Sequence, residues 1–126
     1  MGVDPATGLM RRGTDYTGDV TALTGPLTGL RLDGNWVSGR CRATGWHVQL
    51  QVFSTGSIYG IAGGRVSRLF VAPDPHNWLD TVAAFERGWD REPSDDATRT
   101  LCLAIVRALD GPRATLADAP ATVAAR

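Results

Sequence analysis

The sequence predicts an α+β fold, in which a small antiparallel β-sheet of about five or six strands carries a C-terminal α-helix packed on it. Apolar and polar residues alternate over residues 46–52, which is typical of a half-buried strand. Glycine-containing turns at residues 33–35 and 43–45 separate short β-like segments. Residues 101–109 are mostly apolar and lie between a helix start signal at residues 93–96 and a helix stop signal at residues 111–112.

The chain of 126 residues has the length of one domain with a single core. Residues 1–26 are rich in Gly, Thr, Asp and Pro and contain few large apolar side chains, so we expect a flexible N-terminal arm. Residues 27–111 make up the predicted α+β domain. Residues 112–126 are rich in alanine and lack turn or cap signals, which predicts a flexible tail.

The first half of the domain is predicted to form antiparallel strands joined by tight turns. Asp33-Gly34-Asn35 follows a short β-like segment and supplies residues that tolerate positive φ. In the clearest strand the apolar side chains share one face, and they are Trp46, Val48, Leu50 and Val52. Residues 65–71 also alternate, but neither set is purely polar, which predicts a strand covered on both faces.

The segment 78–89 fits two structures. Trp78, Val82, Phe85 and Trp89 recur at helical spacing. In an extended conformation, residues 83, 85, 87 and 89 share one face instead. The local pattern leaves both open.

The C-terminal helix has signals at both ends. Pro93 and Ser94 precede it, and Gly111 with the following proline ends it. Asp95 and Asp96 favour its positive N-terminal end. Its apolar residues surround nearly the whole circumference, so we expect two packing partners. The sheet is one, and in a domain this small we expect a second subunit to be the other, which predicts a homo-oligomer.

The charges of the chain exclude several classes of function. The 13 basic and 13 acidic residues cancel, which argues against a protein that grips double-stranded nucleic acid through its overall field. All 13 basic residues are arginine. Without lysine there is no P-loop lysine, no kinase-type lysine and no Schiff base to a carbonyl compound.

Residue types that carry catalysis or bind metals are sparse. The only histidines, His47 and His76, lie near no cysteine in the sequence, so no zinc site is expected. A triad built on Ser57 lacks a nucleophile-elbow sequence. Glu86 and Glu92 are the only glutamates and suggest no acid–base pair. We therefore expect a protein that is not an enzyme and has neither a metal nor a cofactor.

Cys41 and Cys102 lie far apart in the sequence, and two buried free thiols are the preferred expectation, with one disulfide left open. No apolar run approaches the roughly 20 residues that cross a bilayer, so no membrane partner is expected. The first residues lack the apolar core of a signal peptide. These features predict a cytoplasmic protein.

Residues 56–69 form the segment richest in candidate binding groups. Its glycines allow tight bends and close approach of the backbone to a ligand. Arg65 and Arg68 offer bidentate phosphate contacts, Tyr59 a stacking face and Ser57 a hydroxyl. The alternative is a hairpin or bulge whose glycines serve only the backbone geometry.

Residues 85–91 form a second candidate segment, in which aromatic residues alternate with arginines and acids. Phe85, Arg87 and Trp89 suit the binding of a flat, charged molecule such as a nucleotide. The alternative is that Phe85 and Trp89 anchor the core while Arg87 pairs with a neighbouring acid.

Together the two segments resemble a family of small bacteriophage and prophage proteins of uncharacterised function. Residues 56–69 carry its Gly-Ser-x-Tyr-Gly-Ile-x-Gly-Gly-Arg-Val-Ser-Arg-Leu pattern, and residues 85–90 carry Phe-Glu-Arg-Gly-Trp-Asp. The resemblance covers about residues 46–90. It implies a phage context, and it favours a strand ending at Trp89 for the ambiguous segment.

The predicted architecture is also similar to phage anti-defence sponges of the Thoeris anti-defence type, which sequester nucleotide-derived immune signals. This similarity implies a non-catalytic protein of the host bacterial cytoplasm that captures a cyclic ADP-ribose isomer or a cyclic oligonucleotide. The predicted ligand-binding residues are Ser57, Tyr59, Arg65, Arg68, Phe85, Arg87 and Trp89. The alternatives are a protein-interaction module, such as an inhibitor of a host enzyme or a virion accessory protein, and a binder of single-stranded nucleic acid.

Overall fold

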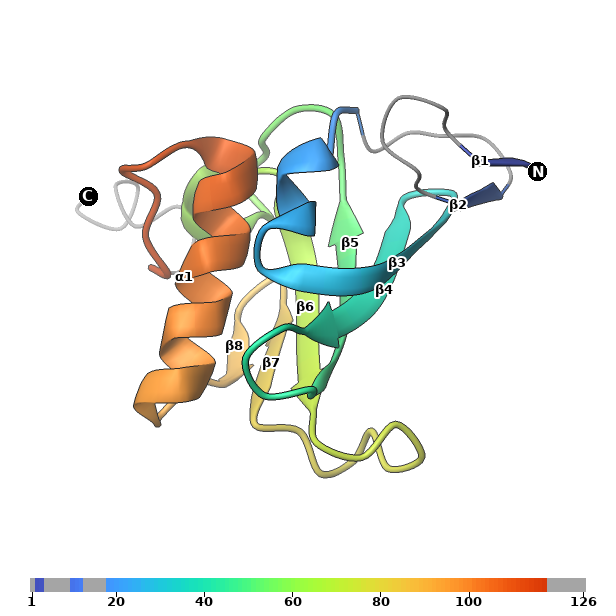
Figure 1. The fold of residues 1–126 in the computed structure, drawn as a ribbon. Helices are drawn as coiled ribbons and strands as arrows, with labels where there is room; N and C mark the ends of the chain where they lie inside the picture. The colour runs from blue at the N-terminus through green and yellow to red at the C-terminus, as the bar shows by residue number, and fades with distance from the viewer. Residues whose placement is uncertain (1, 4–9, 13–17, 118–126) are drawn as a thin grey trace, which may run out of the picture.

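A computed structural model describes residues 2–3, 10–12 and 18–117 and shows the predicted α+β fold (Figure 1). Six antiparallel strands, β3 to β8, form the main sheet, and one long helix, α1, covers one of its faces. The main strands are β3 (Leu27–Asp33), β4 (Trp36–Cys41), β5 (His47–Val52), β6 (Val66–Ala72), β7 (Ala83–Glu86) and β8 (Trp89–Arg91). Two short strands, β1 (Gly2–Val3) and β2 (Met10–Arg12), extend the sheet beyond β3, with β2 parallel to β3.

Consecutive strands are neighbours in the sheet, so the main sheet is a simple meander. One row of paired residues crosses five strands on the helix-facing side, namely Leu32, Val37, Leu50, Leu69 and Phe85. Every side chain of this row is buried. The predicted turn at 33–35 joins β3 to β4, and Gly34 takes a φ of 63° there. The alternation of the sequence therefore defines the core face.

Helix α1 (Asp96–Asp110) begins and ends where the sequence predicts. The Asp95 carboxylate accepts hydrogen bonds from the backbone N–H and the hydroxyl of Thr98, both at 2.8 Å. These hydrogen bonds lower the pKa of Asp95 below its ordinary value. At the other end Gly111 takes a φ of 103° and donates its N–H to the carbonyl of Arg107.

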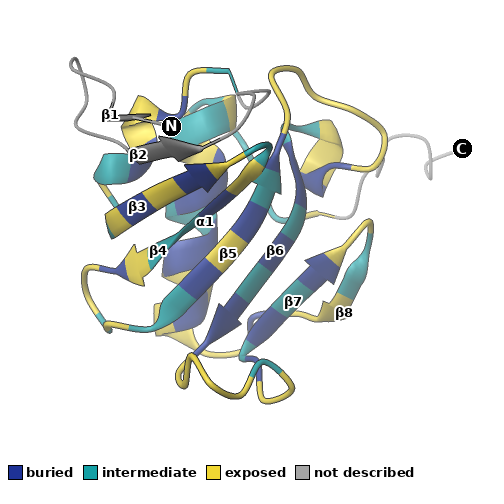
Figure 2. Cartoon of the chain, turned by 90° about the vertical axis from the view of Figure 1, so that its right-hand side faces the viewer, coloured by how far each residue is buried: buried dark blue, intermediate teal, exposed yellow. Residues whose placement is uncertain are grey.

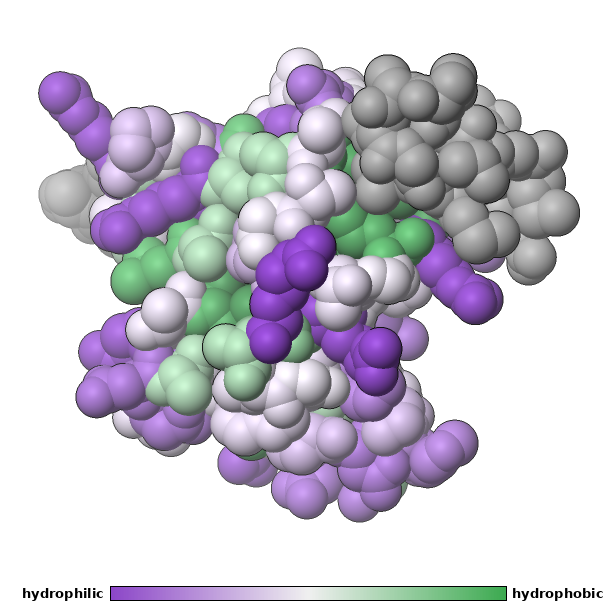
Figure 3. Space-filling view, in the orientation of Figure 1, coloured by the Kyte–Doolittle hydropathy of each residue, from purple (hydrophilic) through white to green (hydrophobic). Residues whose placement is uncertain are grey.

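The helix packs on more than the sheet. The short 3-10 helix η1 (Thr21–Thr24) lies beside it and contributes the buried Leu23 (Figure 1). Past the helix, Ala114 and Leu116 also pack against the core. The chain itself thus supplies neighbours beyond the sheet. On the side shown in Figure 3, apolar residues reach the surface only as separate patches between hydrophilic ones. A homo-oligomer through α1 stays a prediction.

The segment 78–89 is extended where it has regular structure, as the resemblance implies, but Trp89 does not end a strand. Strand β7 ends at Glu86, and a tight turn with Arg87 at a φ of 62° leads into β8, which begins at Trp89. The Glu86 N–H donates to the Gly88 carbonyl at 2.8 Å across this turn. The chain reverses within two residues here, and a turn this short leaves no helical or strand periodicity in the sequence from which it could be predicted.

The packed region reaches beyond residues 27–111 on both sides. Val20 and Leu23 are fully buried although they belong to the expected arm, and residues 112–117 of the expected tail include the partly buried Leu116. The rest of the tail, 118–126, lies outside the described residues. Cys41 and Cys102 are buried and unpaired. No helix within the described ranges is long and apolar enough to cross a membrane.

Candidate functional site

The sheet has one face turned away from α1, and we call it the open face (Figure 2). Pairing between strands arranges its side chains in rows. One row runs Arg31, Ser38, Gln49, Phe70, Ala84, and a second runs Asp33, Trp36, Gln51, Arg68, Glu86. A third pairs Thr28 with Arg40 and Arg40 with His47. Arginine, glutamine and aromatic side chains therefore collect on this face.

A pocket of about 430 Å³ lies on the open face. Strands β3, β4 and β5 provide most of its lining, and the connection from β6 to β7 adds Pro75 and Trp78. We call this the open-face pocket. Its polar and aromatic lining side chains are Arg31, Ser38, Arg40, His47, Gln49 and Trp78. Its volume is in the range usual for small-molecule sites.

The open-face pocket is positively charged although the whole chain is neutral. Arg31 and Arg40 are exposed, and neither guanidinium has a hydrogen bond or ion pair with another described residue. The described lining residues include no aspartate or glutamate. Two unpaired arginines without a carboxylate in the same pocket can accept an anion, and their planar forks match phosphate oxygens.

Local backbone features shape this pocket. A bulge in β3 between Thr28 and Arg31 shifts its register against β4, and Gly29 takes a φ of 65° at the bulge. A side chain at Gly39 would come within 3.0 Å of the Thr28 carbonyl oxygen, so a glycine there lets the strands approach closely. Arg31 pairs with Ser38, and Arg40 lies two residues further along the same face of β4, so strand pairing places the two arginines in one lining.

The glycine-rich segment has mainly a geometric role in the structure. It connects β5 to β6 through the short 3-10 helix η2 (Ile61–Gly63). A side chain at Gly56 or Gly60 would collide with backbone carbonyls of Gly63 and Gly64. A side chain at Gly64 would collide with the Asp110 carboxylate. These contacts agree with the alternative in which the glycines serve the backbone.

Arg65 is directed at the protein backbone. Its side chain donates to the carbonyl of Phe53 at 2.9 Å, of Asp19 at 3.0 Å and of Leu109 at 3.4 Å. Its backbone N–H donates to the Asp110 carboxylate at 3.1 Å. Arg65 therefore ties the start of β6 to the N-terminal segment and to the end of α1, and it lies outside the open-face pocket.

Arg68 lies on the open face, within a polar network next to the pocket. Its guanidinium donates to Glu86 at 3.2 Å and to the Gln51 carboxamide oxygen at 2.6 Å. The same Gln51 oxygen accepts from the Ser67 hydroxyl at 3.1 Å. Arg68 thus has protein partners, whereas Arg31 and Arg40 have none among the described residues.

Ser57, Tyr59 and Arg87 come together at the end of the sheet where the two motif segments meet. The Arg87 guanidinium lies over the Tyr59 ring, with 4.9 Å from its carbon to the ring centroid. The Ser57 hydroxyl accepts a hydrogen bond from the Tyr59 N–H at 3.1 Å. These residues lie outside the lining of the open-face pocket.

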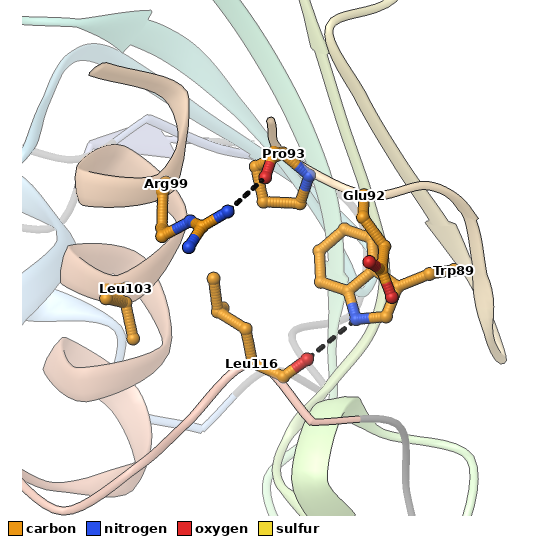
Figure 4. A pocket seen from close by; sticks show the side chains of 6 residues that line it. All are labelled: Trp89, Glu92, Pro93, Arg99, Leu103 and Leu116. Atoms are coloured by element: carbon orange, nitrogen blue, oxygen red, sulfur yellow. Dashed lines mark hydrogen bonds between the residues drawn. The ribbon is translucent and has the colours of Figure 1, made fainter. Parts of the chain in front are cut away.

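Phe85 and Trp89 act as anchors of the packing. Phe85 is fully buried, and its ring meets Trp89 edge-on at 5.1 Å between centroids. The Trp89 indole N–H donates to the Leu116 carbonyl at 2.7 Å (Figure 4). Trp89 also lines a second pocket of about 320 Å³ with Glu92, Pro93, Arg99, Leu103 and Leu116. There Arg99 donates to the Pro93 carbonyl at 3.2 Å, so this second pocket offers no arginine without a protein partner.

The sequence did not predict Arg31, Arg40, Gln49 and Trp78 as site residues. The signal that could have found part of the set is the alternation of β5, which turns His47 and Gln49 away from the core. The arginines belong to two other strands, and their convergence depends on the pairing of β3 with β4, which places Arg31 opposite Ser38. Among the described residues, no group of three or more His, Cys, Asp or Glu side chains could hold a metal ion.

Residues 35–110 match the family model described as a domain of unknown function, DUF7678. The chain belongs to the DUF7678 family. The DUF7678 domain runs from the turn before β4 to the end of α1, so it contains most of the open-face pocket. Arg31, on β3, precedes the matched residues and completes the pocket. Comparisons with curated proteins and with solved structures give no significant match.

Proposed function

We propose that this protein is a non-catalytic binding protein whose open-face pocket holds a small anionic ligand with a flat ring, the chemistry of a nucleotide. The observation that carries the proposal is the pair of arginines, Arg31 and Arg40, that share one pocket with Trp78 and with no carboxylate among the described lining residues. Arginine–phosphate contacts are charge-assisted, and the planar guanidinium can bind two phosphate oxygens at once. An indole provides a broad face for stacking on a base.

Binding without chemistry agrees with the side chains that line the pocket. Acid–base catalysis needs a group that can exchange a proton at a reacting atom, and nucleophilic catalysis needs an activated nucleophile. His47 is the only histidine of the lining, and it is accompanied by neither a carboxylate nor a cysteine among the described lining residues. Ser38 therefore has no carboxylate–histidine pair in the pocket to activate it.

The similarity to phage anti-defence sponges leads to the finer form of the proposal. In that form the ligand is a nucleotide-derived immune signal, a cyclic ADP-ribose isomer or a cyclic oligonucleotide, and its capture in the bacterial host cytoplasm counteracts defence. Arg31 and Arg40 would hold the phosphates, and Trp78 would stack on the base.

Thermal unfolding with a panel of mononucleotides, cyclic ADP-ribose isomers, cyclic oligonucleotides and pyrophosphate tests the proposal. A ligand at 100 times its Kd adds about 2.7 kcal/mol of stability. We expect Arg31→Ala and Arg40→Ala each to remove the shift. Arg113→Ala is the matched control, because Arg113 is exposed and lies outside the pocket. A flat response of the wild type to the whole panel contradicts the proposal.

The alternative of a protein-interaction module has its own supporting observation. Ile58 and Tyr59 are 61% and 50% exposed at the tip of the β5–β6 connection, beside Arg87. Exposed aromatic and arginine side chains are common at interface hot spots. A flat nucleotide response, together with capture of one bacterial protein that Ile58→Ser and Tyr59→Ser both abolish, would favour this alternative.

A further inference from the structure

Two glutamines of β5, Gln49 and Gln51, lie on the open face two residues apart but differ in their hydrogen bonding. The Gln51 amide nitrogen donates to the Asn35 side-chain oxygen at 3.3 Å. Its oxygen accepts from Ser67 and Arg68. Both ends of the Gln51 carboxamide are therefore occupied by the protein.

Gln49 has none of these partners. It is exposed, it lines the open-face pocket, and its carboxamide has no hydrogen bond to another described residue. Its neighbours across the strands are Ser38 on one side and Phe70 on the other. A carboxamide without a protein partner presents one N–H donor side and one oxygen acceptor side to a ligand.

We infer that Gln49 determines the specificity of the pocket by reading the N6/N7 edge of adenine, so that the ligand is an adenine nucleotide. The inference rests on the proposed function. Adenine presents an amino donor at N6 and an acceptor at N7, and a glutamine carboxamide matches both at once. Guanine presents two acceptors, O6 and N7, at the same edge, so one of them faces the carboxamide oxygen.

The placement of the groups agrees with a nucleotide of this kind. Arg31 and Gln49 belong to one row and are separated by two strand spacings, about 10 Å. The phosphate of the ligand then meets Arg31 and Arg40, while its base extends toward Gln49. Trp78, in the connection from β6 to β7, also lines the pocket, and an indole can stack on a base.

Calorimetric titration with AMP and with 7-deaza-AMP, which lacks the N7 acceptor, tests the inference. We expect the wild type to bind AMP about tenfold more tightly than 7-deaza-AMP, as for the loss of a bidentate base contact. In Gln49→Ala the two Kd values should agree within about twofold, because the partner of N7 is already gone. Pyrophosphate should bind the wild type and Gln49→Ala equally.

Gln51→Ala is the matched control. It should lower the melting temperature, because Arg68 and Ser67 lose their acceptor, yet it should keep the preference for AMP. Equal binding of AMP and 7-deaza-AMP by the wild type overturns the inference, and so does a tenfold preference that survives in Gln49→Ala. In both cases AMP still binds, so the proposed function stands while the inference about Gln49 fails. Binding of neither AMP nor pyrophosphate overturns the inference, whereas only a flat response to the whole nucleotide panel also overturns the proposed function.

Discussion

The Arg87 guanidinium lies over the ring of Tyr59 at 4.9 Å, and this contact joins the two sequence segments that carry the family resemblance. Tyr59 belongs to the connection between β5 and β6, and Arg87 to the turn between β7 and β8. Arg87 adopts a φ of 62°, a conformation that costs a non-glycine residue free energy. The contact and the strained turn have opposite effects on stability, which mutations can separate.

Arg87→Ala and Arg87→Gly should therefore differ. Alanine loses the cation–π contact and keeps the unfavourable φ, so we expect it to lower the free energy of unfolding by about 0.5–1 kcal/mol. Glycine loses the same contact but adopts a positive φ readily, and it should be about 1 kcal/mol more stable than the alanine variant. Urea unfolding measures both. Equal stability of the two variants would show that the φ at this turn carries no cost.

Arg65→Ala should destabilise the protein. The arginine donates to carbonyls of Phe53, Asp19 and Leu109, and its loss leaves these acceptors without a charged donor. We expect the free energy of unfolding to fall by about 2–3 kcal/mol in urea titrations. Arg113→Ala, at an exposed position, should change it by less than about 0.5 kcal/mol. If Arg65→Ala keeps its stability but loses ligand binding, Arg65 is a binding residue, as the sequence predicted.

Asp110 should make stability depend on pH in the opposite sense to most carboxylates. Burial of its carboxylate, which packs on Gly64, raises its pKa, while the Arg65 N–H and charge lower it by less. The folded state then holds the proton more tightly than the unfolded state. The contribution of Asp110 to stability therefore decreases as pH rises from 3.8 through the raised pKa.

Asp110→Asn removes this dependence, so its stability relative to the wild type should rise with pH in urea titrations between pH 3 and about 7. Asp95→Asn should show the opposite trend, so that its stability relative to the wild type falls as pH rises. The pKa of Asp95 is lowered by its hydrogen bonds from Thr98, so its stabilisation is present above the ordinary value and is lost in acid. If the stability of both variants relative to the wild type changes with pH in the same direction, the opposite pKa shifts of Asp110 and Asp95 are contradicted.

The thiol of Cys102 should be inert in the folded protein. Burial, with a smaller contribution from the charge of Asp95, raises the pKa of Cys102 to about 12, and the thiolate is the reactive species. In a Cys41→Ser variant, which leaves Cys102 as the single thiol, we expect no reaction with a thiol reagent at pH 8 within hours and complete reaction in denaturing urea. Rapid labelling under native conditions would show that the helix–sheet packing opens readily.

Local sequence patterns predicted the elements whose side chains repeat with a fixed period. The alternation of β5 and the capped segment that forms α1 lie where expected, because one buried face imposes a period on each. The reversal at Arg87 and Gly88 escaped prediction, since a two-residue turn leaves no periodic trace. Val20 and Leu23 show the same limit, because an isolated buried residue in a polar segment has no pattern around it.

The sequence by itself determined the α+β class, the core face of β5 and the helix with the signals at its ends, because these follow from neighbouring residues. Only the tertiary structure decided which arginines share a site. Arg65 and Arg68, close together in the sequence, have protein partners, whereas Arg31 and Arg40 meet in the open-face pocket. The physical reason is register: the pairing of Arg31 with Ser38 places Arg31 beside Arg40, and that register depends on how the strands of the sheet align.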